Sequence, residues 1–115
     1  MKPVGIHHVN LMFDDIDAAR EFYGDVMGFD EIERPDFGFP GLWFQMGAHQ
    51  LHMQPGHAPD SFQHFALEVD DMDAVLEELE SKGFHVDASP TVDGAGKQAF
   101  FKDPTGNVIE LNQPG

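Results

Sequence analysis

The stretch His64-Phe65-Ala66-Leu67-Glu68-Val69-Asp70-Asp71-Met72-Asp73-Ala74 repeats an earlier one, His8-Val9-Asn10-Leu11-Met12-Phe13-Asp14-Asp15-Ile16-Asp17-Ala18. The offset from His8 to His64 is 56 residues, and His, Leu, Asp-Asp, Asp and Ala recur at the same places. Each copy alternates with a period of two and changes at Asp-Asp to helical spacing, which predicts a strand followed by a capped helix. A repeat of half the chain predicts two similar modules and not a solenoid.

The length of the chain limits how these modules are organised. A chain of 115 residues is too short for two independent hydrophobic cores, so we expect a single domain over residues 1–115. Module one is expected over residues 1–56 and module two over residues 61–115. The linker between them, 57–60, lies in a stretch rich in Pro, Gly and His.

Each module is predicted to have the order βαβββ, which makes the fold class α+β with two similar sheets. In module one the pattern predicts strands over 5–13, 29–33, 42–46 and 50–54, and a helix that Asp14 or Asp15 caps and that ends near Met27. In module two it predicts strands over 64–69, 84–88, 97–102 and 107–112, and a helix over 71–82. The segment 103–106, Asp-Pro-Thr-Gly, predicts the turn of the last hairpin.

Composition excludes several classes of function. Six Lys and Arg against 21 Asp and Glu produce a net charge of −15, so we expect no binding to nucleic acid. No apolar run approaches the length of about 20 residues that a membrane span needs, and the N-terminus resembles no signal peptide, so we expect a cytoplasmic protein. The chain has no cysteine, and any metal ion must therefore be bound by His and carboxylate side chains.

Four polar residues occupy matched positions in the two modules. The repeat makes His8 equivalent to His64, and it makes His52 equivalent to Glu110, each in the last strand of its module. A lone histidine is commonly only a core or surface residue, but two modules that pair about a pseudo-twofold axis would bring all four side chains together. Three imidazoles and a carboxylate suit a divalent metal ion such as Ni, Zn, Fe, Co or Mn. The remaining histidines lack this support and are interpreted as surface residues: His7, which alternates away from His8, and His49, His57 and His85.

Several longer segments resemble a known family. They are Ile6-His7-His8-Val9-Asn10-Leu11, Phe22-Tyr23-Gly24-Asp25-Val26-Met27-Gly28-Phe29, Gln50-Leu51-His52-Met53, His64 to Asp70, and Phe101-Lys102-Asp103-Pro104-Thr105-Gly106-Asn107-Val108-Ile109-Glu110-Leu111. They are similar to the vicinal oxygen chelate superfamily of glyoxalases, bleomycin-resistance proteins and extradiol dioxygenases. The resemblance implies two βαβββ modules that each form half of an open barrel, and a homodimer. It also implies that His8, His52, His64 and Glu110 are metal ligands.

The function that we expect is a divalent-metal-dependent lyase or isomerase of the glyoxalase type, acting on a small carbonyl or oxygen-chelating molecule. Glu110, or Glu68 on the face of His64, would move the substrate proton, although Glu68 also fits a solvated strand end. Four residues either line a substrate pocket or only pack against the core: Asn10, Phe37, Phe39 and Trp43. Two alternatives stay open: an Fe(II) extradiol-type dioxygenase that uses His8, His64 and Glu110, and a non-catalytic protein that binds small molecules.

Overall fold

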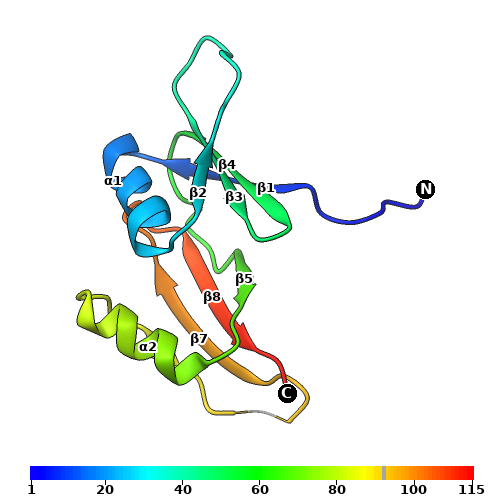
Figure 1. Cartoon of the computed structure of the whole chain (residues 1–115), viewed down its shortest axis with the longest axis vertical. Coiled ribbons are helices and arrows are strands. Elements are labelled where there is room, and N and C mark those ends of the chain that lie inside the picture. Colours follow the sequence, from blue (N-terminus) through cyan, green and yellow to red (C-terminus); the bar gives the residue numbers. More distant parts are fainter. Residues whose placement is uncertain (92) are drawn as a thin grey trace. The chain divides into compact units, whose positions relative to one another are not determined.

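The computed structural model describes residues 1–91 and 93–115, and the chain divides into two compact units, Met1–Ala58 and Pro59–Gly115. Figure 1 shows the elements of both units. The boundary between the units falls in the segment 57–60 that we expected to link the modules. No described helix is long and apolar enough to cross a membrane.

Unit 1 contains one four-stranded sheet and one helical segment. Its elements are β1 (His8–Phe13), α1 (Ile16–Arg20), the π-helical η1 (Glu21–Val26), β2 (Asp30–Ile32), β3 (Leu42–Met46) and β4 (His49–Pro55). The strands lie in the order β1-β4-β3-β2, with β1 parallel to β4 and the other pairs antiparallel.

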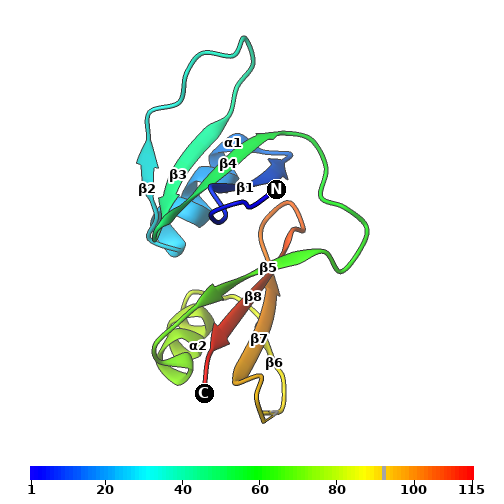
Figure 2. The ribbon, with the colours of Figure 1, turned by 90° about the vertical axis from the view of Figure 1, so that its right-hand side faces the viewer.

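Unit 2 repeats this arrangement. Its elements are β5 (His64–Glu68), α2 (Met72–Ser81), β6 (Asp87–Ala88), β7 (Lys97–Lys102) and β8 (Val108–Gln113). The strand order is β5-β8-β7-β6, again with the first strand parallel to the last, and Figure 2 shows α2 beside this sheet. The predicted α+β fold with two βαβββ modules and open sheets is therefore confirmed.

The repeated Asp-Asp motif begins both helices through its second aspartate. The Asp15 carboxylate accepts hydrogen bonds from the backbone N–H groups of Asp17 and Ala18 at 3.0 and 3.1 Å. The Asp71 carboxylate accepts one from Ala74 N–H at 3.1 Å. Each aspartate satisfies backbone donors that lack a partner inside the helix.

Several predicted elements differ from the structure at their ends. The predicted strand over 84–88 is wrong for 84–86: Phe84 N–H donates to the carbonyl of Leu79 and closes α2, so only Asp87 and Ala88 pair with β7. The predicted strand over 5–13 begins at His8, where the pairing with β4 begins at Gln50. The predicted α-helix to Met27 widens after Arg20, because Met27 N–H bonds to Phe22 five residues earlier.

Along β4 and β8, apolar side chains on one face of the sheet alternate with polar side chains on the other. In β4, Leu51 and Met53 are buried in the core, and Gln50, His52 and Gln54 face the opposite side. In β8, Ile109 and Leu111 are buried in the same way, and Glu110 and Asn112 alternate with them. The predicted metal ligands therefore occupy the face of each sheet that does not pack into the apolar core.

The turn before β8 is built around a buried carboxylate. Asp103 is 5% exposed, and its Oδ1 accepts hydrogen bonds from the backbone N–H groups of Thr105, Gly106 and Asn107 at 2.8 to 3.0 Å. Its Oδ2 accepts from the side-chain amide of Asn107 at 2.8 Å. These bonds fix the point at which the chain enters β8, and thereby the position of Glu110.

Candidate functional site

The strand register places the four predicted ligands at equivalent positions in the two units. Asn10 lies opposite His52 in unit 1, and Ala66 lies opposite Glu110 in unit 2. In each unit the histidine of the first strand is two residues before that partner, so His8 is diagonal to His52 and His64 is diagonal to Glu110. Diagonal neighbours on one face of a sheet are within reach of long side chains.

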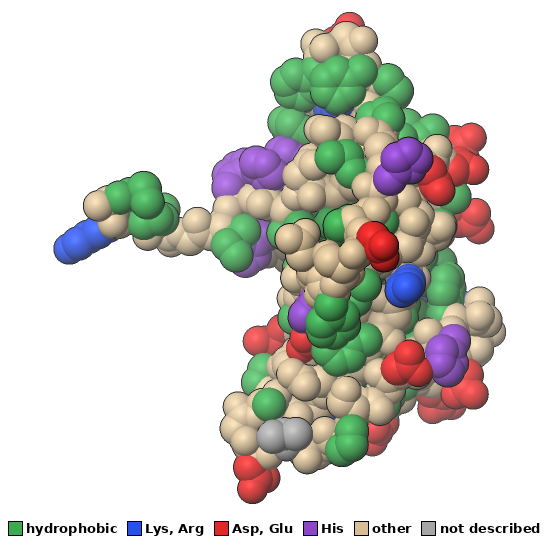
Figure 3. All heavy atoms as spheres, turned by 180° about the vertical axis from the view of Figure 1, so that it is seen from behind, with side chains coloured by type: hydrophobic (Ala, Val, Ile, Leu, Met, Phe, Trp, Pro, Cys, Tyr) green, Lys and Arg blue, Asp and Glu red, His purple; other side chains and the backbone are tan. Residues whose placement is uncertain are grey.

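In unit 1 the two imidazoles form part of a stack of rings. The ring centroids of His8 and His52 are 3.9 Å apart with planes 17° apart, and those of Trp43 and His52 are 3.9 Å apart with planes 3° apart. His52 is therefore held between the other two rings and is only 9% exposed. Figure 3 shows histidine side chains gathered beside the N-terminal segment of this unit.

The ring nitrogens of unit 1 have identifiable partners. His52 Nε2 lies 2.8 Å from the amide oxygen of Gln50, so Nε2–H donates and Nδ1 carries the lone pair. Burial lowers the pKa of His52, and the nearby charges of His8, His7 and Arg34 lower it further. The His8 and His52 rings are stacked, so the lone pairs of their ring nitrogens lie in nearly parallel planes and do not point at one common position. One of the two rings would have to turn before both imidazoles could bind a single ion.

His7 is placed differently from the expectation that it alternates away from His8. It is exposed, but its Nδ1 lies 3.0 Å from His8 Nδ1 and the two rings meet edge to face at a centroid distance of 5.3 Å. The alternation argument fails because β1 begins only at His8, so His7 lies outside the regular strand.

In unit 2 an imidazole nitrogen and a carboxylate oxygen face each other at close range. His64 Nε2 lies 3.1 Å from Glu110 Oε1, and Glu110 is only 6% exposed. His64 Nδ1–H donates to the backbone carbonyl of Phe62 at 2.8 Å, which leaves Nε2 as the nitrogen that faces the carboxylate. Asn112 donates its amide N–H to Glu110 Oε2 at 3.1 Å. Both sides of the pair are thus held by groups outside it.

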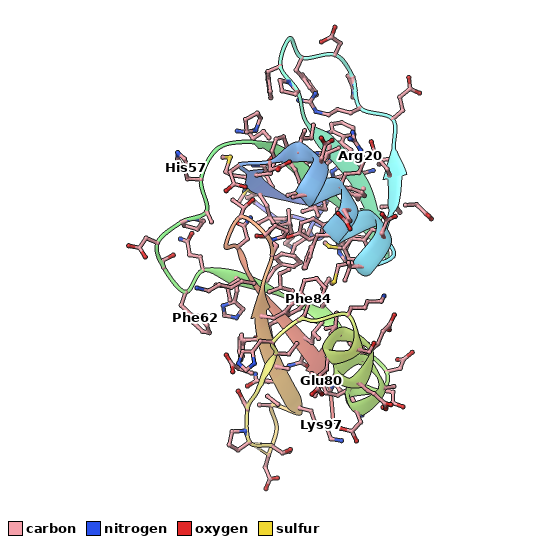
Figure 4. All side chains as sticks on the ribbon, turned by 90° about the vertical axis from the view of Figure 1, so that its left-hand side faces the viewer. Arg20, His57, Phe62, Glu80, Phe84 and Lys97 are labelled. Carbon is pink, nitrogen blue, oxygen red and sulfur yellow. The ribbon has the colours of Figure 1, made fainter. Side chains whose placement is uncertain are left out.

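Aromatic rings surround His64 on the approach to β5. The Phe62 ring lies 4.7 Å and the Phe100 ring 5.5 Å from the imidazole centroid. Figure 4 shows Phe62 on the segment that leads into β5, where it is 64% exposed. The hydrogen bond to the Phe62 carbonyl orients the His64 imidazole, and these two rings restrict it further.

The donor types fit a divalent first-row metal ion. Imidazole nitrogen and carboxylate oxygen are ligands for such ions, and a second hydrogen bond from each ligand to its surroundings is the usual support. Among residues 1–91 and 93–115 there is no group of three or more His, Cys, Asp or Glu side chains that could hold a metal ion. Each unit brings two of the predicted ligands together, and the four-ligand site stays a prediction.

Unit 1 also contains a cavity next to His52. It has a volume of about 200 Å³, and all four predicted pocket residues line it: Asn10, Phe37, Phe39 and Trp43. Arg34 lines the same cavity and was missed from the sequence, although it directly precedes the aromatic loop. Whether these residues bind a substrate stays a prediction.

The other predicted residues lie at the surface. Glu68 is exposed at the end of β5 and shares the face of His64 by strand alternation. His49 and His57 are exposed, as is His85, whose Nε2 lies 2.7 Å from the carboxylate of Asp87. A catalytic role of Glu68 stays a prediction.

Comparisons with known proteins agree in one family. The model of the Glyoxalase/Bleomycin resistance protein/Dioxygenase superfamily matches residues 5–111. The lactoylglutathione lyase of Haemophilus influenzae is 29% identical, over 92% of this chain and 90% of that protein. The crystal structure of a Bacillus anthracis protein assigned to the glyoxalase family is 27% identical with a TM-score of 0.90, covering 100% of this chain and 98% of that one. The antibiotic binding protein TnmS3 of Streptomyces sp. CB03234 is 30% identical with a TM-score of 0.83, covering 100% and 99%.

Proposed function

Because the chain belongs to the Glyoxalase/Bleomycin resistance protein/Dioxygenase superfamily, we propose that it is a divalent-metal-dependent lyase or isomerase of the glyoxalase type. Its substrate is a small carbonyl compound that chelates the ion through two oxygens. The main observation in support is the His64–Glu110 pair, in which an oriented imidazole lies 3.1 Å from a buried carboxylate. The equivalent pair in unit 1, His8 and His52, would supply the other two ligands.

His64 and Glu110 would have different roles in binding the metal ion. The bound ion would act as a Lewis acid toward the substrate oxygens. His64 would bind the ion through Nε2, because the Phe62 carbonyl holds the proton on Nδ1. Glu110, whose Oε2 accepts a hydrogen bond from Asn112, would supply the negative charge of the ligand set.

Proton transfer needs a carboxylate close to the reacting carbon. Glu110 is buried beside His64, and Glu68 is exposed on the same face of unit 2. We propose that one of them takes the proton from the carbon next to the substrate carbonyl and returns it to the neighbouring carbon. The exposed position of Glu68 would let it exchange that proton with water.

The test combines metal analysis with turnover. Protein purified without a histidine tag should contain a divalent ion, and EDTA should remove both the ion and the activity toward a panel of hemithioacetals and diketones. The panel includes the hemithioacetal of methylglyoxal and glutathione, in view of the lactoylglutathione lyase relatives. Glu110→Gln should lose metal-dependent turnover, and full activity in that variant would refute the proposal. Glu68→Gln should lose turnover but keep the metal if Glu68 is the proton carrier.

A non-catalytic binding protein is the second candidate. The aromatic cavity of unit 1 and the similarity to an antibiotic binding protein favour it. Ligand binding of undiminished affinity after EDTA treatment, together with no turnover, would support this candidate over the enzyme.

The Fe(II) dioxygenase remains the third candidate, and consumption of O₂ with catechols would identify it. Ligands in two units raise the question of assembly, and we propose a cytoplasmic homodimer. Light scattering should then report twice the mass of one chain.

A further inference from the structure

The guanidinium of Arg34 is held at the edge of the unit 1 cavity by three contacts. Its Nη1–H donates to the backbone carbonyl of Phe39 at 2.9 Å. Its central carbon lies 4.8 Å from the centroid of the Phe37 ring and 4.9 Å from that of the Phe39 ring. Cation–π contacts of this kind orient a guanidinium without neutralising its charge.

Gly41 has no side chain, and this leaves room for the guanidinium of Arg34. A Cβ atom on Gly41 would lie 2.5 Å from Cζ and from Nε of Arg34 and 2.7 Å from the backbone carbonyl oxygen of Met53. Any larger residue at position 41 would therefore crowd both the guanidinium and the neighbouring strand β4. Arg34 and Gly41 lie at the two ends of the loop between β2 and β3, which Figure 1 shows as a long excursion from the sheet.

No acidic side chain of the described residues neutralises Arg34. Arg34 forms no ion pair with any carboxylate of residues 1–91 and 93–115. The nearby Asp36 instead accepts a hydrogen bond from Gly38 N–H at 2.8 Å. None of the described residues that line the cavity is acidic, although the chain has a net charge of −15. A guanidinium has further N–H donors in a planar fork that matches a carboxylate.

The wall of the cavity next to Arg34 is aromatic. Trp43 lies in the stack on His52, and the Phe37 ring lies 6.2 Å from the Trp43 ring. The volume of about 200 Å³ is below the range of about 300–1,000 Å³ of pockets that bind drug-sized ligands. The cavity therefore suits a small planar group.

We propose that this cavity binds small aromatic carboxylic acids, with the Arg34 guanidinium bound to the carboxylate and the Trp43 ring beside the planar body. As a statement about the substrate class, the inference rests on the proposed function, since His52 joins the cavity to the predicted metal ligands. The binding itself depends only on unit 1 and needs no metal ion.

Fluorescence of Trp43 reports this binding directly, because it is the only tryptophan of the sequence. EDTA-treated full-length protein is titrated with benzoate and, separately, with benzamide, which has nearly the same size and no charge. Benzoate should quench the emission with saturation, and benzamide should bind about tenfold more weakly or worse, because only a carboxylate pairs with the guanidinium through charge-assisted bonds.

Three variants separate Arg34 from general effects of charge. Arg34→Met keeps a long unbranched side chain beside the two phenylalanine rings and should lower the benzoate affinity about tenfold or more, to the level of benzamide. Lys97→Met removes one positive charge from unit 2, where Lys97 lies at the start of β7 (Figure 4), and should bind benzoate like the wild type. Gly41→Ala keeps the charge but crowds the guanidinium and the Met53 carbonyl oxygen, and should also weaken benzoate binding. Circular dichroism and thermal melting establish that each variant is folded.

The two proposals fail in different ways. Equal binding of benzoate and benzamide, or wild-type benzoate affinity in Arg34→Met, would overturn this inference whatever the metal experiments show. Benzoate binding that is retained in Glu110→Gln, while metal binding is lost, is the expected result. Benzoate that binds as described to a protein without metal-dependent turnover would support the cavity and refute only the proposed enzyme.

Discussion

His64 Nε2 and Glu110 Oε1 lie 3.1 Å apart although 46 residues separate them in the chain. The parallel pairing of β5 with β8 makes them diagonal neighbours, as the pairing of β1 with β4 does for His8 and His52. The same topology thus builds one polar pair in each unit, and only the chemistry of the last residue differs. Glu110 makes the unit 2 pair anionic, which favours a cation.

Asn112→Ala should weaken metal binding without removing a ligand. The Asn112 amide donates to Glu110 Oε2 at 3.1 Å and orients the carboxylate. Loss of such an outer contact typically lowers metal affinity by about 10- to 100-fold. Competition with a chromogenic chelator measures the affinity. The control is Gln98→Ala: Gln98 lies opposite Asn112 in the pairing of β7 with β8, and this variant should bind metal like the wild type. Asn107→Ala is not a suitable control, because the Asn107 amide donates to the buried Asp103.

Gln50→Leu should destabilise unit 1. The substitution removes the amide oxygen that accepts from His52 Nε2 at 2.8 Å and leaves a largely buried donor without that acceptor. We expect a loss of about 1 to 3 kcal/mol in the free energy of unfolding, measured with urea. Gln54→Leu, on the same face of β4, is the matched control and should change stability much less. Equal losses in the two variants would contradict the role of Gln50.

The stability of the metal-free protein should depend on pH through His52. Burial, with the charges of His8, His7 and Arg34, holds the pKa of His52 below its usual 6.5 in the folded chain. Between the folded pKa and 6.5 the unfolded chain binds more protons, so the free energy of unfolding rises with pH. The contribution of neutral His52 to the free energy of unfolding is complete above pH 6.5, and it is lost as the pH falls through that value toward the pKa of His52 in the folded chain.

Urea unfolding of EDTA-treated protein over a series of pH values checks this dependence. His52→Gln should flatten the decline on the acid side of pH 6.5 relative to the wild type. An unchanged decline in the variant would assign the dependence to other groups.

Asp103→Ala should be the most destabilising single change in the last hairpin. It removes the acceptor of three backbone N–H groups and of the Asn107 amide, in a turn whose two ends, Asp103 and Asn107, are buried. A charged acceptor of this kind contributes about 1.5–3 kcal/mol for one bond, so we expect a loss of about 3 kcal/mol or more. Asp36→Ala, which removes a single exposed bond to Gly38, should cost about 1 kcal/mol or less in the same denaturation experiment.

Much of the fold was predictable because local rules governed it. The repeat of the His8 stretch at His64 predicted two equivalent modules, and both sheets have the same strand order. The Asp-Asp motif predicted both helix starts, since an aspartate side chain bonds to N–H groups only a few residues away. The error at 84–86 arose because the Phe84 N–H bonds to the Leu79 carbonyl, and the error at His7 because the regular strand begins only at His8.

The sequence by itself determined which side chains share a strand face, because a strand alternates with a period of two whatever it packs against. Alternation placed Asn10 on the face of His8, and the repeat indicated His8, His52, His64 and Glu110 as one set. Tertiary structure alone decided which atoms these side chains use: Gln50 binds His52 Nε2, and the Phe62 carbonyl binds His64 Nδ1. It also decided that the Arg34 guanidinium lies against both Phe37 and Phe39. Such contacts depend on the path of a loop and on the rotamers of several residues at once, and neither follows from local periodicity.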